Sequence, residues 1–213
     1  MSAVTRARRA YIVAAVKART LKSRLILHRK RGERAKRLRK AYIRASRYAA
    51  KLKRDYRVTK KLMARPLRER ALAEARSMLG VVERGGNNTG PEVDKIIKAN
   101  GGVVGEPWCG DGVAYWYRRA GSKAVTRGWA AAWGIFGLFG IRKVSDPLPG
   151  DLAVYNWQHV GVFEKWTSKS KGNFDAIEAN TGTGGKTSDT TRDGIHRRHR
   201  NRADVKYFLR VTR

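Results

Sequence analysis

Three reactive side chains, Cys109, His159 and Glu178, follow one another in an order that could build a thiol-based catalytic site. Cys109 is the only cysteine of the 213-residue sequence, so it can form no disulfide within the chain and cannot build a zinc knot. It is therefore a small core residue or a nucleophile. Pro107 favours a helix start just before it, which would place the thiol in a first turn. There the helix dipole and free N–H groups stabilise a thiolate and can receive an oxyanion.

His159 is the candidate base, although a lone histidine at a strand end is more often structural. Glu178 and Asn180 lie two residues apart on a predicted strand, so their side chains project from the same face. If Trp166 and Asn173 close the hairpin, His159 stands opposite Asn180 and diagonal to Glu178, within reach of either. A register slip of one residue would undo this arrangement.

These residue types suit amide hydrolysis through an acyl-enzyme. The Cys109 thiolate would attack an amide carbonyl, and His159 would form an ion pair with the thiolate and then protonate the leaving amine. Glu178 or Asn180 would orient the ring and fix its tautomer. His159 would then activate the water of the second half-reaction. A surface carboxylate and a turn asparagine are the plain alternatives for Glu178 and Asn180.

The elements that must position these groups follow from the apolar spacing. A helical period predicts helices at about 66–80, 91–100, 108–120 and 129–133, with a glycine-aromatic loop at 134–140. After 147–150 the period changes to two, which predicts strands at 152–155, 159–165, 174–179 and 207–211, and a weaker one near 195–198. Helices followed by an antiparallel sheet define an α+β domain.

The N-terminal third is a polycationic segment. Residues 1–70 hold 26 of the 48 Lys/Arg and three acidic residues, whereas the rest of the chain is only moderately basic. Helices are predicted at 3–31 and 33–63, as a helical hairpin or two frayed helices with few long-range contacts, because the apolar stripe is thin and the charge dense. We place the domain boundary near Arg65–Pro66, with a basic arm at 1–65 and a catalytic domain at 66–213.

Such charge density requires anionic partners, which could be wall polymers, anionic lipid or nucleic acid. A solvated helical spacer is the plain alternative. The Tyr11–Val16 run is too short for a signal peptide, and no stretch approaches a membrane span. We therefore expect a protein made in a cytoplasm without a signal peptide.

Residues from about 67 to 211 resemble the CHAP family, the cysteine, histidine-dependent amidohydrolases/peptidases that are frequent in phage lysins. The matching phrases are Ala73–Gly80, Asn87–Val93, Pro107–Gly110, Pro149–Tyr155, His159–Val162 and Ile177–Thr181. The resemblance implies a papain-like fold and peptidoglycan as the substrate, acted on at the cell wall or by an enzyme carried in the virion. It places the nucleophile on Cys109, the base on His159, the ring-orienting acid on Glu178 and a fourth polar residue on Asn180.

The sequence departs from the family pattern at several points. Gly110 and Gly112 stand where alanine is more usual, which predicts a softer start to the nucleophile helix. Gln158 precedes the histidine where glycine is common, and residues 181–206 are long and basic.

Some CHAP relatives bind calcium. Asp94 with Asn87 and Asn88 could supply oxygen atoms, but the loop lacks the regular acidic spacing of such sites. We expect neither a metal nor a cofactor.

Two other functions remain open at this stage. One is a nucleic-acid-binding or virion-packaged basic protein whose CHAP-like part is inactive, and the other is a transglutaminase-like acyl transferase. Trp129, Trp133 and Trp157 could line a groove for a peptide or glycan, although core packing is the more common use. His196 and His199 lie in a basic stretch with Arg198, Arg200 and Arg202 and are interpreted as surface residues.

Overall fold

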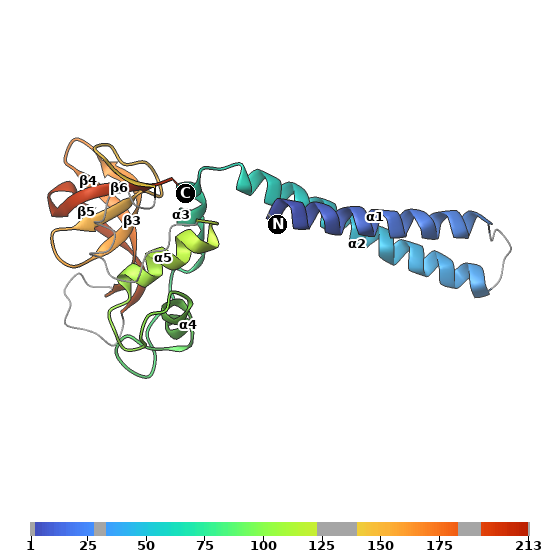
Figure 1. Ribbon diagram of the computed structural model, residues 1–213, viewed down its shortest axis with the longest axis horizontal. Coiled ribbons are helices and arrows are strands. Elements are labelled where there is room, and N and C mark those ends of the chain that lie inside the picture. Colours follow the sequence, from blue (N-terminus) through green and yellow to red (C-terminus); the bar gives the residue numbers. More distant parts are fainter. Residues whose placement is uncertain (1–2, 28–32, 123–139, 183–192, 213) are drawn as a thin grey trace. The chain divides into compact units, whose positions relative to one another are not determined.

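The computed structural model describes residues 3–27, 33–122, 140–182 and 193–212. The chain divides into two compact units, Met1–Arg65 and Pro66–Arg213 (Figure 1). The helix predicted at 129–133 and nearly all of the loop predicted at 134–140 lie outside the described residues. Among the described helices, none combines the length and apolar character needed to cross a bilayer.

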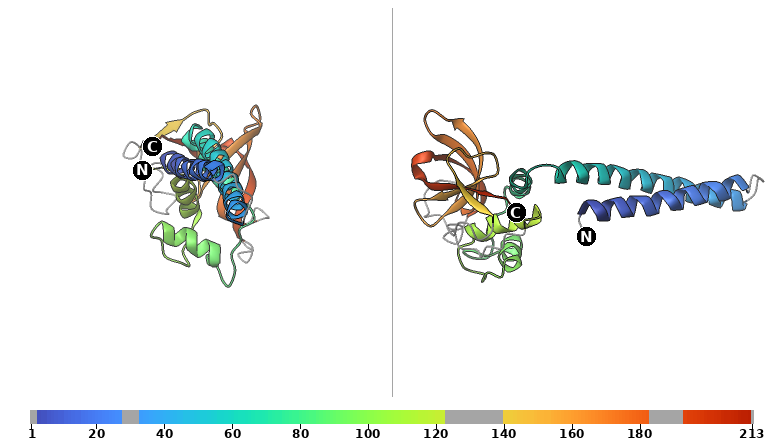
Figure 2. Two further views of the ribbon diagram at one scale, coloured as in Figure 1. Left: turned by 90° about the vertical axis from the view of Figure 1, so that its right-hand side faces the viewer. Right: turned by 45° about the horizontal axis from the view of Figure 1, so that its top comes forward.

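The first unit is a pair of helices, α1 (Ala3–Leu27) and α2 (Glu33–Met63), that lie side by side in both views of Figure 2. Alanines line the seam between them: Ala14, Ala18 and Ala49 are buried. Tyr11 stacks on Tyr56 at 6.5 Å between ring centroids. The two helices contact each other closely, so the expectation of few long-range contacts is wrong. Small side chains let the backbones approach without a wide apolar stripe.

Three helices open the second unit: α3 (Leu67–Ser77), α4 (Pro91–Ala99) and α5 (Cys109–Arg119). All three were predicted to within about three residues. Pro66 is the residue before α3 rather than part of its first turn. Pro91 is the first residue of α4, where its missing N–H costs no hydrogen bond.

A six-stranded sheet with the order β1-β6-β2-β3-β4-β5 completes the unit, and each pair of neighbours is antiparallel. Its strands are β1 (Ile141–Val144), β2 (Leu152–Tyr155), β3 (Val160–Ser168), β4 (Asn173–Thr181), β5 (Gly194–Asn201) and β6 (Val205–Val211). The sequence did not predict β1, and β5 is longer than expected. The α+β prediction agrees with this mixture of helices and antiparallel sheet.

The two faces of the sheet pack differently. Side chains from α3, α4 and α5 form the larger core with one face, to which β4 contributes Ile177 and Ala179. The other face carries a smaller, aromatic-rich cluster, to which β4 contributes Phe174 and Ala176. Strand alternation therefore places the Glu178 side chain on the aromatic face, away from α5.

Gly112 explains how α5 sits so close to the sheet. A Cβ atom at Gly112 would come within 2.4 Å of the Ala179 Cβ atom. This glycine is therefore needed for the close approach of α5 to β4, and its absence of a side chain is a packing requirement rather than a softening of the helix start.

Gly150 and Asp151, in the phrase that resembles CHAP proteins, hold the fold together. Gly150 has φ +94°, and a Cβ atom there would lie 1.9 Å from the carbonyl oxygen of Arg68. Asp151 is fully buried and accepts a forked pair of hydrogen bonds from Arg210. Gly150 therefore permits a close approach of two backbone segments, and Asp151 anchors Arg210 through a buried ion pair.

Candidate active site

Cys109 is the first residue of α5, and it is 5% exposed. The N–H groups of the first helical turn have no acceptor within the helix, and they carry the positive end of the helix dipole. The thiol therefore lies where a developing negative charge on sulfur or on a substrate oxygen is stabilised.

His159 lies in the turn just before β3, rather than within the strand as predicted. Its Nε2 atom lies 2.8 Å from Oε2 of Glu178, and the ring lines the same groove as Cys109. Because Glu178 engages Nε2, Nδ1 is the ring nitrogen available to the sulfur. Burial lowers the pKa of His159, but the hydrogen bonds and charges of Cys109 and Glu178 outweigh it and raise the pKa to about 9. The ring is therefore a cation at neutral pH.

Glu178 is fully buried, and its carboxylate is surrounded by donors. Besides His159, it accepts from the Tyr155 hydroxyl at 2.6 Å and from Arg200, whose Nε and Nη2 atoms lie 2.8 and 2.6 Å away. Burial raises the pKa of Glu178, but the hydrogen bonds from Arg200 and His159 lower it to about 2. The side chain is therefore a carboxylate across the working pH range.

Gly161 makes room for this carboxylate. It is the direct partner of Glu178 in the pairing of β3 with β4. A Cβ atom at Gly161 would come within 2.6 Å of the Glu178 Cγ atom. The missing side chain lets Glu178 lie across β3 and reach the imidazole.

Arg200 is a member of the candidate site that the sequence analysis missed, since it was grouped with surface residues of a basic stretch. Its guanidinium lies over the rings of Tyr155 and Trp157, at 5.3 and 5.5 Å from their centroids. The aromatic faces and the Glu178 carboxylate together fix the cation. Arg200 lies on β5, and residues 183–192 separate β5 from β4 in the sequence. The residue spacing therefore could not predict which residue of β5 would contact Glu178.

Asn180 does not take the position across from His159 that the register predicted. Its backbone has φ +54°, which breaks the alternation of β4 and turns the side chain away. Its Oδ1 accepts from the backbone N–H of Trp108 at 3.1 Å, and its Nδ2 donates to Asn88 at 2.8 Å and Glu83 at 3.2 Å. The carboxylate of Glu178, and not this amide, carries the hydrogen bond to the ring.

Glu83 is the second residue that the sequence analysis missed. It is buried, accepts from the Trp108 indole N–H at 2.8 Å and from the Asn88 backbone N–H at 2.9 Å. With Asn180, it ties the segment that precedes Cys109 to the sheet. Glu83 is far from Cys109 in the sequence, so no pattern of residue spacing connected the two.

A groove of about 550 Å³ lies over the thiol. Cys109, His159 and Asn180 line it, whereas Glu178 lies behind the ring and outside the groove. Trp157 forms part of the lining and is 45% exposed, as the groove interpretation of this tryptophan requires. The remaining lining residues are Pro107, Gln158, Thr181, Gly182, Asp193, Arg198 and Arg200. Trp129 and Trp133 lie outside the described residues.

The segment considered for calcium has another use for its carboxylate. Oδ1 of Asp94 accepts from the Thr89 hydroxyl and from the Gly90 backbone N–H, both at 2.9 Å, which ties α4 to the loop before it. Within residues 3–27, 33–122, 140–182 and 193–212, no group of three or more His, Cys, Asp or Glu side chains is arranged to hold a metal ion.

Comparisons with known proteins leave the family of this chain open. No protein-family model matches the sequence, and no curated protein matches it. A solved structure of a wild-type endolysin, LysIME-EF1, is similar over 69% of this chain and 64% of its own, with 16% sequence identity and a TM-score of 0.45. The chain thus spans less than two thirds of that endolysin. So weak a likeness does not identify an activity.

Proposed function

We propose that the unit formed by residues 66–213 is a cysteine-dependent amide hydrolase of the cell wall. The observation that supports this proposal is that Cys109 and His159 line one open groove, while the buried Glu178 carboxylate binds the ring from behind at 2.8 Å. A buried core cysteine needs no imidazolium beside it, and a structural histidine needs no thiol.

In the first half-reaction the Cys109 thiolate attacks the carbonyl carbon of an amide, and the carbonyl oxygen becomes an oxyanion. The backbone N–H of Cys109 at the start of α5 is a suitable donor for this oxyanion. As the carbon–nitrogen bond breaks, the His159 imidazolium gives its proton to the departing amine. A thioester to Cys109 and a neutral imidazole remain.

In the second half-reaction His159 accepts a proton from water as the water attacks the thioester carbon. Collapse of that intermediate expels the Cys109 thiolate and releases the carboxylic acid, which restores the thiolate–imidazolium pair. Glu178 holds Nε2 of the ring throughout, so that Nδ1 stays aimed at the sulfur. Asn180 and Glu83 position the segment before the nucleophile.

Peptidoglycan is the substrate that we assign, on the strength of the CHAP-like phrases in the sequence. The scissile bond is an amide of the wall peptide or the muramoyl-peptide linkage. The protein would act at the bacterial cell wall, as an endolysin or as a lysin carried in the virion.

The test is turbidity loss of purified peptidoglycan sacculi with the full-length protein. We expect clearing with the wild type and a loss of at least 10³-fold with Cys109→Ala, with Cys109→Ser as the matched variant of similar size. Clearing that survives both substitutions would overturn the proposal. Mass spectrometry of the digest then identifies the bond, because a muramoyl amidase and an endopeptidase release different ends.

The alternative is a basic nucleic-acid-binding protein with an inactive CHAP-like domain. It predicts tight, steeply salt-dependent DNA binding and no release of muropeptides. The charge of residues 1–65 favours it, whereas the paired thiol and imidazolium favour the enzyme.

A further inference from the structure

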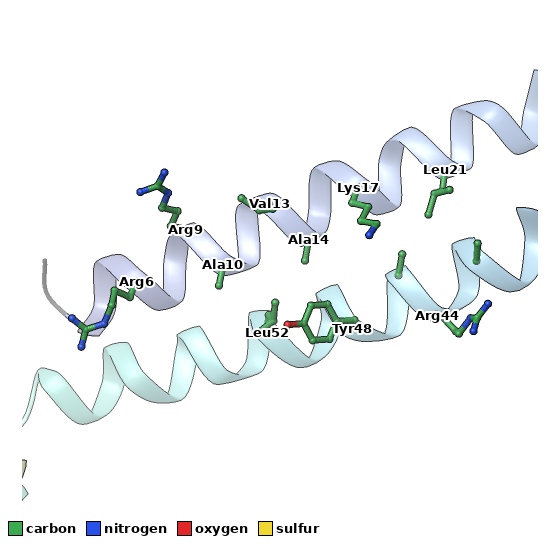
Figure 3. A pocket seen from close by; sticks show the side chains of 12 residues that line it. Arg6, Arg9, Ala10, Val13, Ala14, Lys17, Leu21, Arg44, Tyr48 and Leu52 are labelled. Carbon is green, nitrogen blue, oxygen red and sulfur yellow. The ribbon is translucent and has the colours of Figure 1, made fainter.

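The two-helix unit contains a groove that its own packing does not fill. The groove has a volume of about 990 Å³, and α1 and α2 both line it (Figure 3). Ala10 and Ala14 point from α1 toward α2, where Leu52 and Tyr48 lie (Figure 3). The lining is therefore largely apolar, on a unit whose outer surface is otherwise cationic.

Cations surround this apolar lining. Arg6, Arg9 and Lys17 on α1 and Arg44 on α2 belong to the groove, and none of its lining residues is acidic. Residues 1–65 contain 24 lysines and arginines against two acidic residues. The groove thus combines an apolar interior with a positively charged rim.

An exposed apolar edge continues the groove along α1. Ile12, Val13 and Val16 are 46%, 63% and 58% exposed, and they belong to a stretch without charge between Arg9 and Lys17. Residues of this size are usually buried, so a contiguous exposed set marks a surface that another apolar body covers.

Charge and polarity select the occupant. A second copy of the unit would bring its own arginines against this rim, and like charges repel. Duplex nucleic acid and wall polymers offer phosphates but nothing to fill an apolar groove. A phospholipid of an anionic bilayer supplies both, with phosphates for the rim and acyl chains for the interior.

We propose that the α1–α2 hairpin is a docking surface for an anionic phospholipid bilayer. The helix pair lies in the plane of the membrane interface, with Val13, Val16 and Tyr48 facing the acyl boundary. Arg9 and Arg44 contact the phosphates beside the groove. This mode matches the cationic, amphipathic surface of the pair.

The lone cysteine makes a direct test possible. In the full-length Cys109→Ser protein, Val13→Cys is labelled with a polarity-sensitive dye, and Ile43→Cys is the matched control. Ile43 does not line the groove and lies about 140° around α2 from Tyr48. With vesicles of phosphatidylglycerol and phosphatidylcholine, the dye at position 13 should shift to the blue, and the dye at position 43 should not. Vesicles of phosphatidylcholine alone should shift neither.

A second comparison separates the groove from total charge. Arg9→Gln with Arg44→Gln removes two groove cations, whereas Arg39→Gln with Arg57→Gln removes two exposed cations about 180° from Tyr48. The groove pair should weaken vesicle binding by on the order of tenfold or more, and the control pair by about threefold or less.

Three outcomes would overturn the proposal: no binding to the anionic vesicles, equal dye shifts at both positions, or equal losses from both arginine pairs. A blue shift at position 13 with duplex DNA at the same phosphate concentration would indicate that the surface binds nucleic acid instead of phospholipid. Because the Cys109→Ser background lacks the proposed nucleophile, these results stand apart from the wall-hydrolysis test.

Discussion

Arg200 holds Glu178 through both carboxylate oxygens, and this ion pair lies directly behind the imidazole of His159. A buried carboxylate that touches only a histidine would have its pKa raised by burial. The two hydrogen bonds from Arg200 keep Glu178 ionised, so that its charge is available to stabilise the imidazolium. In the proposed mechanism Arg200 is thus a positioning residue that acts through Glu178.

In the proposed hydrolase, replacing Arg200 should make the activity sensitive to acid. In Arg200→Gln the buried carboxylate loses its main donor, the pKa of Glu178 rises, and activity should fall most steeply at pH 5–6, with less loss at pH 8. Loss of one partner of a buried pair should also destabilise the fold by about 3 kcal/mol. The pH profile of wall clearing and chemical denaturation measure the two effects.

The control for this prediction is Arg197→Gln. Arg197 neighbours the site in sequence but pairs with Glu164, at 2.5 Å. We expect its pH profile to match the wild type. If both variants show the same profile, Arg200 has no special link to Glu178 in catalysis.

Removing the charge of Glu178 should act on the histidine. In Glu178→Gln the amide can still accept a hydrogen bond from the ring, but the pKa of His159 should fall from about 9 toward its ordinary value. Activity should drop by on the order of 10²–10⁴, as when the carboxylate of a catalytic triad becomes an amide. NMR titration of the His159 ring protons measures the pKa.

A second histidine–carboxylate pair provides the control. Asp175 lies 3.1 Å from His199, whose side chain is 61% exposed. Asp175→Asn should leave both the titration of His159 and the activity unchanged. A His159 pKa that stays near 9 in Glu178→Gln would show that Cys109 alone sets it.

The pKa values of the site also predict how stability changes with pH. The pKa of His159 is raised to about 9, so its contribution is full below about pH 6.5 and is lost as the pH rises through 9. The pKa of Glu178 is lowered to about 2, so its contribution is full above about pH 4.5 and is lost as the pH falls through 2. Stability from this pair should therefore be greatest between about pH 4.5 and 6.5.

Activity should follow the imidazolium. The value of kcat/KM is expected to decline with a midpoint near pH 9, since the neutral ring cannot protonate the leaving amine. Wall-clearing rates in overlapping buffers measure this decline. A rate that keeps rising to pH 10 would contradict the assignment of His159 as the acid.

Asp111, in the first turn of α5, should weaken the fold at neutral pH. It is buried, and among the described residues its Oδ1 atom has no hydrogen-bond partner. Burial, with the charge of Glu106, raises the pKa of Asp111 to about 6 against a hydrogen bond from Asn100. Because the folded state favours the protonated form, the stability is full below about pH 4 and is lost as the pH rises from there through about 6.

Asp111→Asn should therefore raise the Tm most at pH 8 and change it little at about pH 3.5. Thermal unfolding at the two pH values measures the difference. A variant that is less stable at both would indicate that the carboxylate has a partner in solution that outweighs its burial.

Much of this site could be predicted from the sequence because its helix and strands follow from the spacing of nearby apolar residues. The helix that begins at Cys109 and the strands around His159 and Glu178 follow from apolar spacing. The predicted register is correct at Gly161 and Glu178 even though the assumed closing pair is wrong. Ser168, not Trp166, faces Asn173, and two bulges in β3 restore the register before it reaches the site.

Other features depend on contacts that sequence spacing does not encode. Arg200 contacts Glu178 from β5, and the sequence between β4 and β5 is too long for the pairing of these two strands to be predicted from it. Glu83 reaches Trp108 through tertiary packing alone. The Asn180 side chain departs from strand alternation because its backbone torsion φ is +54°, and no pattern of residues in the sequence predicts that torsion. The alanine seam of the hairpin was overlooked because alanine contributes little to an apolar stripe.

Two glycines should separate the chemistry of the site from its packing. Gly112→Ala would push its Cβ atom against that of Ala179, 2.4 Å away, and neither side chain can move aside. We expect a loss of about 1–3 kcal/mol in the free energy of unfolding. Gly161→Ala meets the Cγ atom of Glu178 at 2.6 Å, and that longer side chain can swing away. It should therefore lose less stability and more activity.

The decisive readout is again the titration of His159. Displacing Glu178 in Gly161→Ala should lower the pKa of His159, whereas Gly112→Ala should leave the pKa near 9 in the molecules that remain folded. Denaturation curves and ring-proton titrations on the two variants measure both quantities. If Gly161→Ala keeps the high pKa and full activity, then Glu178 does not need the space above Gly161, and its hold on the imidazole is set by Arg200 and Tyr155 alone.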